Sequence, residues 1–233
     1  SLHDALPIYF FKRIKMQEKI DRIKKIIAEA DAVIITAGAG MGVDSGLPDF
    51  RGDHGFWKAY PPLKDKDIGF TDIANPQWFF SDPKLAWAFY GHRLNLYKNT
   101  EPHEGFRLLL DLVKSKNNNY FIYTSNVDGH FQKAGFDKDK IYECHGSIHH
   151  AQCIHSNDGM IWRMCESSVA VDGAKFVATK MPVCPECGCV SRPNIMMFYD
   201  HEFNAKRTLA QRKRYEEWLD EKKKNRFSGL CSS

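Results

Sequence analysis

The 233-residue sequence lacks any apolar run that approaches the roughly 20 residues needed by a membrane-spanning helix. It also lacks a strong charge imbalance, because 33 basic residues stand against 29 acidic ones and leave a net charge of +4. A charge this small does not indicate a nucleic-acid partner unless it gathers in one patch. We therefore expect a cytoplasmic protein, a monomer, with neither membrane nor nucleic acid among its partners.

The sequence also lacks a secretory signal and evenly spaced cysteine pairs. Its seven cysteines therefore favour reduced thiols or a metal site over a disulfide framework. With 43% hydrophobic residues the chain can bury a substantial core. Its length suits one α/β domain with a small inserted module.

The first fifteen residues do not share the pattern that follows them. From Met16 onward, an apolar helical face is marked by Ile20, Ile23, Ile26 and Ile27. We expect residues 1–15 to be a non-native leader and residues 16–233 to form the domain.

The most informative stretch runs from residue 31 to residue 52. The apolar, β-branched residues 32–36 predict a buried parallel strand. Gly38, Ala39, Gly40 and Gly42 follow at once, and small residues in such a turn let backbone N–H groups approach a phosphate. The general dinucleotide fingerprint is nevertheless missing, because Val43 stands where its third glycine belongs.

The rest of the chain alternates helices with apolar strands. Residues 53–82 predict loops with short helices, which would form either a flexible cover or an ordered surface excursion. Helices are expected from Pro83 and from His103, and strands at 120–124 and from Ile141. This order predicts a doubly wound parallel sheet of the Rossmann type, whose ligands lie at the carboxyl ends of the strands.

Polar residues follow two of these strands. Asn126 and Asp128 come after the strand at 120–124, where such residues are most often part of a turn. His145 ends the next strand, and with a pKa near ~6.5 a histidine can accept a proton at neutral pH.

Three of these segments resemble the motifs of the sirtuins, in the order in which that family has them. They are Gly38-Ala39-Gly40 with residues 45–52 (SGLPDFRG), residues 124–129 (TSNVDG) and His145-Gly146-Ser147. The resemblance implies an NAD-dependent protein lysine deacylase, a deacetylase or desuccinylase, which transfers the acyl group to ADP-ribose and releases nicotinamide. An NAD glycohydrolase or ADP-ribosyltransferase of the same family, or a catalytically silent NAD-binding fragment, remains an alternative.

The resemblance also assigns roles to residues. His145 would be the catalytic base and Asn126 would act beside the ribose. Ser125 replaces the glutamine with which the family contacts the ribose hydroxyls. The residues expected to bind NAD are Gly38, Ala39, Gly40, Asp49, Phe50, Arg51, Ser125, Asn126 and Asp128.

Cys184 and Cys187 form a Cys-x2-Cys knuckle, which is half of a tetrahedral zinc site. The sirtuin module has an earlier Cys-x2-Cys, of which this chain has Cys153 but carries Ser156 in place of the partner. We expect a zinc-ribbon-like module at about 148–192 with Cys153, Cys184 and Cys187 as ligands. The fourth ligand stays open among His155, Cys165 and Cys189, and a ribbon without metal is the alternative.

Two segments point to an acyl-lysine protein or peptide as substrate. Residues 192–199 (RPNIMMFY) resemble the family segment that pairs with the peptide backbone, which implicates Met197 and Phe198. Tyr199 stands there in place of a glycine. Tyr90 and Arg93 lie one helical turn apart, and this pair binds the acyl carboxylate in sirtuins that remove succinyl or malonyl groups. A solvated helix face is the alternative for that pair.

The last segment predicts a charged helix from Asn204 to Lys224. Its expected buried positions are Leu209, Tyr215, Trp218 and Leu219. In sirtuins a further strand and a glycine- and serine-rich loop complete the adenosine side of the pocket. We expect this chain to be a fragment with an incomplete carboxyl end.

Overall fold

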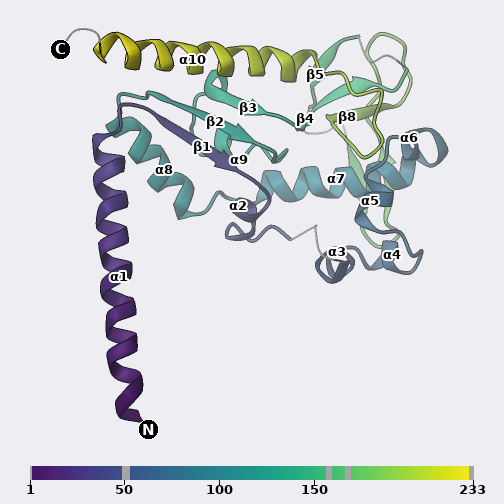
Figure 1. Ribbon diagram of the computed structural model, residues 1–233. Helices are drawn as coiled ribbons and strands as arrows, with labels where there is room; N and C mark the ends of the chain where they lie inside the picture. The colour runs from purple at the N-terminus through teal and green to yellow at the C-terminus, as the bar shows by residue number, and fades with distance from the viewer. Residues whose placement is uncertain (1, 49–52, 156–158, 166–168, 231–233) are drawn as a thin grey trace.

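The computed structural model describes residues 2–48, 53–155, 159–165 and 169–230. Its central element is a parallel sheet in the order β1-β2-β3 (Figure 1). The strands are β1 (Val33–Ala37), β2 (Tyr120–Thr124) and β3 (Ile141–Glu143). All three lie where the sequence predicts strands. Their carboxyl ends are in register, because Ala37 pairs with Thr124 and Thr124 pairs with Glu143.

Helices cover both faces of this sheet. On one face lie α8 (Glu104–Ser115) and α9 (His130–Lys133), and on the other lies α10 (Lys206–Leu230), which runs along the sheet at the top of Figure 1. The core between α8, α9 and the sheet consists of Ile35, Phe106, Val113, Tyr120, Ile122, Phe131, Phe136 and Ile141. This arrangement confirms the predicted α/β class with a parallel sheet.

The expected burial of the first strand is wrong for two of its five residues. Ile35 faces the core, but Ile34 and Thr36 point to the other face and are exposed. The reason is the position of α10, whose Tyr215 and Trp218 rings contact Phe121 of β2 and do not reach β1.

The predicted burial of α10 also needs correction. Leu209 is 55% exposed, whereas Thr208 and Gln211 are buried. Near its start the helix meets the polar end of β3, where Gln211 and Arg207 bind the buried carboxylate of Glu143. Polar residues therefore occupy the inward face there, and Tyr215, Trp218 and Leu219 are half-buried further along.

Helix α1 (Leu2–Glu29) runs continuously past residue 16 and projects from the body of the molecule (Figure 1). The apolar face predicted from the isoleucine spacing is present but exposed, with Ile23 and Ile26 more than half accessible. Among the described residues, no helix combines the length and apolar composition required to cross a membrane.

The segment between β1 and α7 forms short helices, as the sequence predicts. They are α2 (Gly40–Val43), α3 (Asp53–Ala59), α4 (Pro61–Lys64), α5 (Phe70–Ile73) and α6 (Trp78–Ser81). Phe56, Leu63, Ile73 and Phe79 are buried against α7 and its neighbours, so that the segment is packed onto the protein.

Helix α7 (Pro83–Asn99) begins where the sequence predicts, because the Asp82 carboxylate accepts the backbone N–H of Leu85 at 3.0 Å. It is buried on nearly all sides over its first nine residues. Gly91 lies where a Cβ atom would come within 2.4 Å of Val169 Cγ1, so the helix approaches that chain segment closely.

The remaining strands form two small antiparallel sheets. One has the order β5-β4-β8 and consists of β4 (Gly146–Cys153), β5 (Ile161–Arg163) and β8 (Ser191–Ile195). The other pairs β6 (Ala170–Asp172) with β7 (Val177–Lys180). A 3-10 turn, η1 (Lys138–Lys140), precedes β3.

Candidate active site

A cavity of about 610 Å³ lies at the carboxyl ends of the parallel strands. The aligned ends of β1, β2 and β3 bring the residues that follow each strand to one edge of the sheet. Ala39, Ser125, Asn126, Asp128 and His145 all line this cavity. The topology thus brings together the polar residues that the sequence predicts to act together.

The turn after β1 contributes one wall. Ala39 lines the cavity, and the carbonyl oxygen of Gly38 accepts a hydrogen bond from Asn126 Nδ2 at 2.9 Å. Gly40 is exposed, with nothing within 4 Å of the place where a Cβ atom would stand. Asp49, Phe50 and Arg51, which the sequence assigns to the same site, lie outside the described residues.

The loop after β2 fixes two polar side chains. Asn126 is held by its bond to Gly38, and its backbone N–H donates to Thr124 Oγ1 at 3.0 Å. Asp128 is 8% exposed, and one of its carboxylate oxygens accepts the backbone N–H of His130 at 2.9 Å. Burial raises the pKa of the Asp128 carboxyl. This buried carboxyl in a cavity wall can accept a hydrogen bond from an amide of a ligand.

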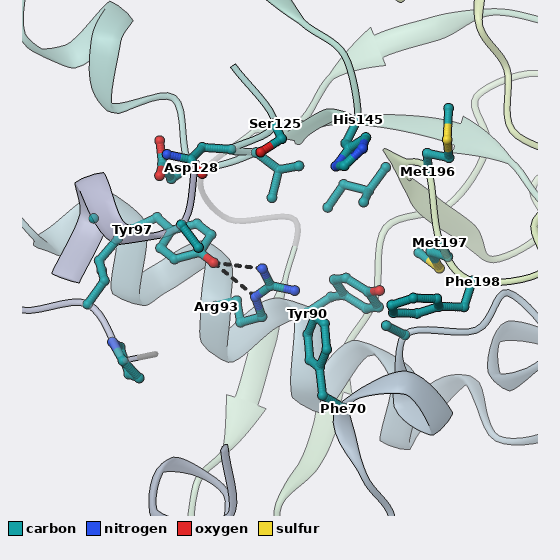
Figure 2. A pocket seen from close by; sticks show the side chains of 18 of the residues that line it. Phe70, Tyr90, Arg93, Tyr97, Ser125, Asp128, His145, Met196, Met197 and Phe198 are labelled. Atoms are coloured by element: carbon teal, nitrogen blue, oxygen red, sulfur yellow. Dashed lines mark hydrogen bonds between the residues drawn. The ribbon is translucent and has the colours of Figure 1, made fainter. Parts of the chain in front are cut away.

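His145 stands on the opposite side of the cavity from Tyr90 and Phe70 (Figure 2). Gly146, the next residue, has φ +81°, and a Cβ atom there would lie 2.1 Å from the backbone oxygen of Asn194. Only glycine therefore permits this turn into β4. The backbone oxygen of His145 accepts the N–H of Met196 at 3.0 Å, which joins the histidine to the segment after β8.

The segment Met196–Phe198 forms the next part of the wall. Its three backbone N–H groups donate to the protein: Met196 to His145, Met197 to the Asp200 carboxylate and Phe198 to Ala74. Arg192, which is almost fully buried, binds both oxygens of the Asp200 carboxylate. This buried ion pair holds the turn that carries Met197 and Phe198.

Tyr199 keeps the backbone conformation that a glycine would adopt, with φ +56°. Its side chain is 82% exposed. The replacement of the family's glycine therefore leaves the turn in the left-handed region, where a side chain is strained.

Tyr90 and Arg93 both line the cavity from α7, at 1% and 7% exposure. The alternative of a solvated helix face is therefore wrong, because α5, the loop after β2 and β8 enclose this side of the helix. Burial raises the pKa of Tyr90 to about 12, so its hydroxyl is protonated at neutral pH. A guanidinium and a phenol in one apolar wall can bind a small carboxylate.

Sequence reasoning missed one polar residue of this wall. Arg93 Nε and Nη2 donate to Tyr97 Oη at 3.0 and 2.7 Å, drawn as dashed lines in Figure 2. Tyr97 lies four residues after Arg93, so helical spacing could have placed it beside the arginine. Phe70 and Leu47 also line the cavity, and neither carries a sequence signal for that position.

The cysteine cluster lies apart from this cavity, since none of its members is among the residues that line it. Cys153, Cys184 and Cys187 have their sulfur atoms within 4.8 Å of one another, and Cys153 Sγ lies 3.6 Å from Cys187 Sγ. Three thiols at this spacing fit a tetrahedral zinc ion. Cys165 is exposed, and Ser156 lies outside the described residues.

Residues 38–217 match the Sir2 family. The chain belongs to this family. The sirtuin motifs are thus confirmed as marks of family membership, and the match covers the cavity, the segment after β8 and the first half of α10.

Curated relatives of this sirtuin carry the description NAD-dependent protein deacylase. The protein from Aeropyrum pernix is 32% identical over 174 residues, which cover 75% of this chain and 62% of the relative. The protein from Aquifex aeolicus is 30% identical over 166 residues, which cover 71% and 61% respectively. The chain therefore spans less than two thirds of the length of these relatives.

Solved structures of Sir2 homologues have the same fold. A complex with NAD superposes with a TM-score of 0.59 at 28% identity, covering 76% of this chain and 61% of that one. A mutant homologue in complex with 2′-O-acetyl ADP ribose gives 0.60 at 26% identity, covering 77% and 64%.

Proposed function

We propose that this sirtuin binds NAD and an acyl-lysine peptide in the cavity at the strand ends and acts as an NAD-dependent protein lysine deacylase. The observation that carries the proposal is the meeting of Asn126, Asp128 and His145 in one cavity with Tyr90 and Arg93. The first three come from consecutive strand ends, and the other two from a helix that faces them. The NAD and 2′-O-acetyl ADP ribose complexes of homologues with the same fold support this assignment.

Different residues of the cavity would contact NAD and the acyl-lysine peptide. Bound NAD would supply the nicotinamide–ribose bond. This bond would break as the carbonyl oxygen of the acyl group replaces nicotinamide on the ribose. Asp128 would hold the nicotinamide amide, and Asn126, fixed on Gly38, would orient the ribose side. His145 would take a proton from a ribose hydroxyl. One water molecule would be consumed as the amide is broken, and the products would be deacylated lysine, nicotinamide and O-acyl-ADP-ribose.

The segment after β8 would hold the peptide on the other side. Because the N–H groups of Met196, Met197 and Phe198 donate within the protein, a peptide strand would pair by donating to backbone oxygens of this segment. Phe198 is 42% exposed and would contact the peptide. The turn at Tyr199 keeps the left-handed backbone conformation of a glycine, so the segment can still present its backbone to a peptide. This favours a peptide deacylase over a glycohydrolase that needs no peptide.

A nicotinamide-release assay tests this function. The chain is incubated with NAD, with and without an acyl-lysine peptide, and nicotinamide is measured together with the deacylated peptide. Release that needs peptide is the expected result. Release without peptide would indicate a glycohydrolase or ADP-ribosyltransferase, and no release would indicate a silent binding module; either result would overturn the proposal.

We also propose a preference for acyl groups that end in a carboxylate. Tyr90 and Arg93 place one cation and one hydroxyl donor in an apolar wall, and an acetyl group has no charge to use them. Arg93→Met should lower desuccinylation about tenfold or more relative to deacetylation, as expected for the loss of a charged hydrogen bond. Arg107→Met, at an exposed arginine of α8, is the matched control. Equal desuccinylation by the two variants would contradict the preference.

We propose in addition that Cys153, Cys184 and Cys187 bind a structural zinc ion. The proximity of their sulfur atoms supports this, and the fourth ligand remains open among His155, Cys165 and Cys189.

A further inference from the structure

The Arg93 side chain is hydrogen-bonded to Tyr97, four residues further along the same helix. The Tyr97 hydroxyl oxygen accepts from two nitrogens of the guanidinium, Nε at 3.0 Å and Nη2 at 2.7 Å. Both side chains are buried, at 7% and 4% exposure. The third nitrogen of Arg93 points toward Tyr90 in Figure 2.

Aromatic rings surround the same guanidinium. Its central carbon lies 5.3 Å from the ring centre of Phe89, 5.4 Å from that of Tyr97 and 5.7 Å from that of Tyr90. The rings restrict the plane of the guanidinium and attract its charge, but a ring face does not fix rotation within that plane. The two hydrogen bonds to one oxygen do fix it, because they engage one edge of the planar group.

Tyr97 is itself held in place. The centres of the Tyr97 and His130 rings lie 6.4 Å apart, with the two rings edge to face. His130 packs in the same way on Phe106 of α8. Burial raises the pKa of the Tyr97 hydroxyl, and the nearby negative charge of the Asp128 carboxylate raises it further. The hydroxyl is therefore present as a neutral phenol at neutral pH.

We propose that Tyr97 is a positioning residue for acyl recognition: it orients the Arg93 guanidinium in advance, so that the cavity favours an acyl chain ending in a carboxylate. This rests on the proposed function, since it takes Tyr90 and Arg93 as the carboxylate site. A long, flexible side chain that is already fixed loses less freedom when the ligand binds. Without the Tyr97 hydroxyl, Arg93 would keep its charge but lose its fixed direction.

The test is a comparison of peptide affinities that needs no turnover. Fluorescently labelled peptides carrying one succinyl-lysine or one acetyl-lysine are titrated with the chain, and anisotropy gives each dissociation constant. The variants are Arg93→Met, Tyr97→Phe and the two combined. Tyr120→Phe is the matched control, because it removes another buried hydroxyl, which accepts the backbone N–H of Asp137 at 2.9 Å outside the cavity. Tyr97→Met is measured alongside, so that the result does not depend on one variant folding.

The unaltered chain and Tyr120→Phe should both favour the succinyl peptide. Tyr97→Phe should reduce the succinyl-to-acetyl affinity ratio about tenfold, the loss expected for hydrogen bonds from a charged group. The combined variant should have no lower ratio than Arg93→Met alone, because the tyrosine acts through the arginine.

The contrary outcomes separate the two proposals. If the unaltered chain binds the two peptides equally or binds neither, the carboxylate site itself is wrong. If it favours the succinyl peptide, and both Tyr97 variants keep the full ratio while Arg93→Met loses it, the positioning role of Tyr97 alone is overturned. A Tyr120→Phe ratio that falls as far as that of Tyr97→Phe would also overturn it, because the effect would then be one of core packing.

Discussion

Gly146 shows how strongly a single residue can restrict this site. It combines φ +81° with a Cβ position 2.1 Å from the backbone oxygen of Asn194, and it directly follows His145. Gly146→Ala should lower the free energy of unfolding by about 2–4 kcal/mol, because backbone strain and overpacking add. Urea unfolding measures this loss. Gly173→Ala is the control, since nothing lies within 4 Å of its Cβ position and its φ is not positive, and it should change stability by less than about 0.5 kcal/mol.

The buried ion pair between Arg192 and Asp200 should contribute strongly to stability. Both side chains are almost completely buried, at 2% and 0% exposure. Asp200→Asn should destabilise the fold by about 3–5 kcal/mol, because it leaves a buried guanidinium without its counter-charge. Glu104→Gln interrupts an exposed pair with Arg107 and should reduce stability by less than about 1 kcal/mol. Similar melting temperatures for the two variants would contradict the structural role of the buried pair.

At the scale of elements, the sequence could predict the strands and that they form a parallel sheet. Residues 120–124 alternate with helical segments of clear apolar period, and local pattern is enough to place them. Burial of a whole element depends on contacts that local pattern does not contain. The exposed Ile34 and Leu209 show this, since each is apolar at the expected spacing but is 44% or 55% exposed in the described part of the chain.

The same limit explains what was missed at the cavity. Tyr97 has no motif of its own and gains its importance only from its two bonds to Arg93. His145, Asn126 and Asp128 could be proposed because their segments resemble the sirtuin motifs and follow parallel strands whose carboxyl ends meet at one edge of the sheet. The residues that hold them in place use backbone groups. For example, the Met196 backbone N–H donates to the backbone oxygen of His145. A backbone contact does not depend on the type of side chain, so the sequence does not reveal it.

The three-cysteine cluster joins β4 to the loop before β8, and it carries a prediction for that element. Purified protein should contain about one zinc ion per chain, and a strong chelator should lower the melting temperature by several degrees, because metal affinity contributes to the stability of the folded state. Zinc is measured by mass spectrometry. Cys184→Ala should lose the metal, whereas Cys144→Ala, at a cysteine outside the cluster, should retain it. Zinc retained by Cys184→Ala would show that the cluster is not the site.

The fourth ligand can be assigned with the same measurement. His155→Ala, Cys165→Ala and Cys189→Ala are compared for zinc content and for the absorption spectrum of the cobalt-substituted protein. The variant that removes the fourth ligand should change the cobalt spectrum, because thiolate and imidazole ligands give different bands. If none of the three changes it, a ligand other than these residues completes the site.

At the scale of the whole molecule, the parallel sheet, the antiparallel sheets and α10 meet around the polar end of β3 and the start of β4. His150 is half-buried there beside the charge of Arg207, and its partial burial together with that charge lowers the pKa of its imidazole to about 3. The histidine is thus neutral in the folded chain. In the unfolded chain it takes up a proton near pH ~6.5.

This difference predicts an acid-sensitive fold. Between pH 6.5 and about 3 the unfolded state binds more protons at His150 than the folded state does, so this contribution to stability is complete above pH 6.5 and declines as the pH falls. The decline should approach about 1.4 kcal/mol per pH unit. Urea unfolding of the unaltered chain and of His150→Gln at pH 7.5, 6, 5 and 4 isolates the effect, because the other titrating groups are common to both proteins. The stability advantage of the unaltered chain should shrink steadily below pH 6.5; two curves that stay parallel across this range would contradict a half-buried, neutral His150.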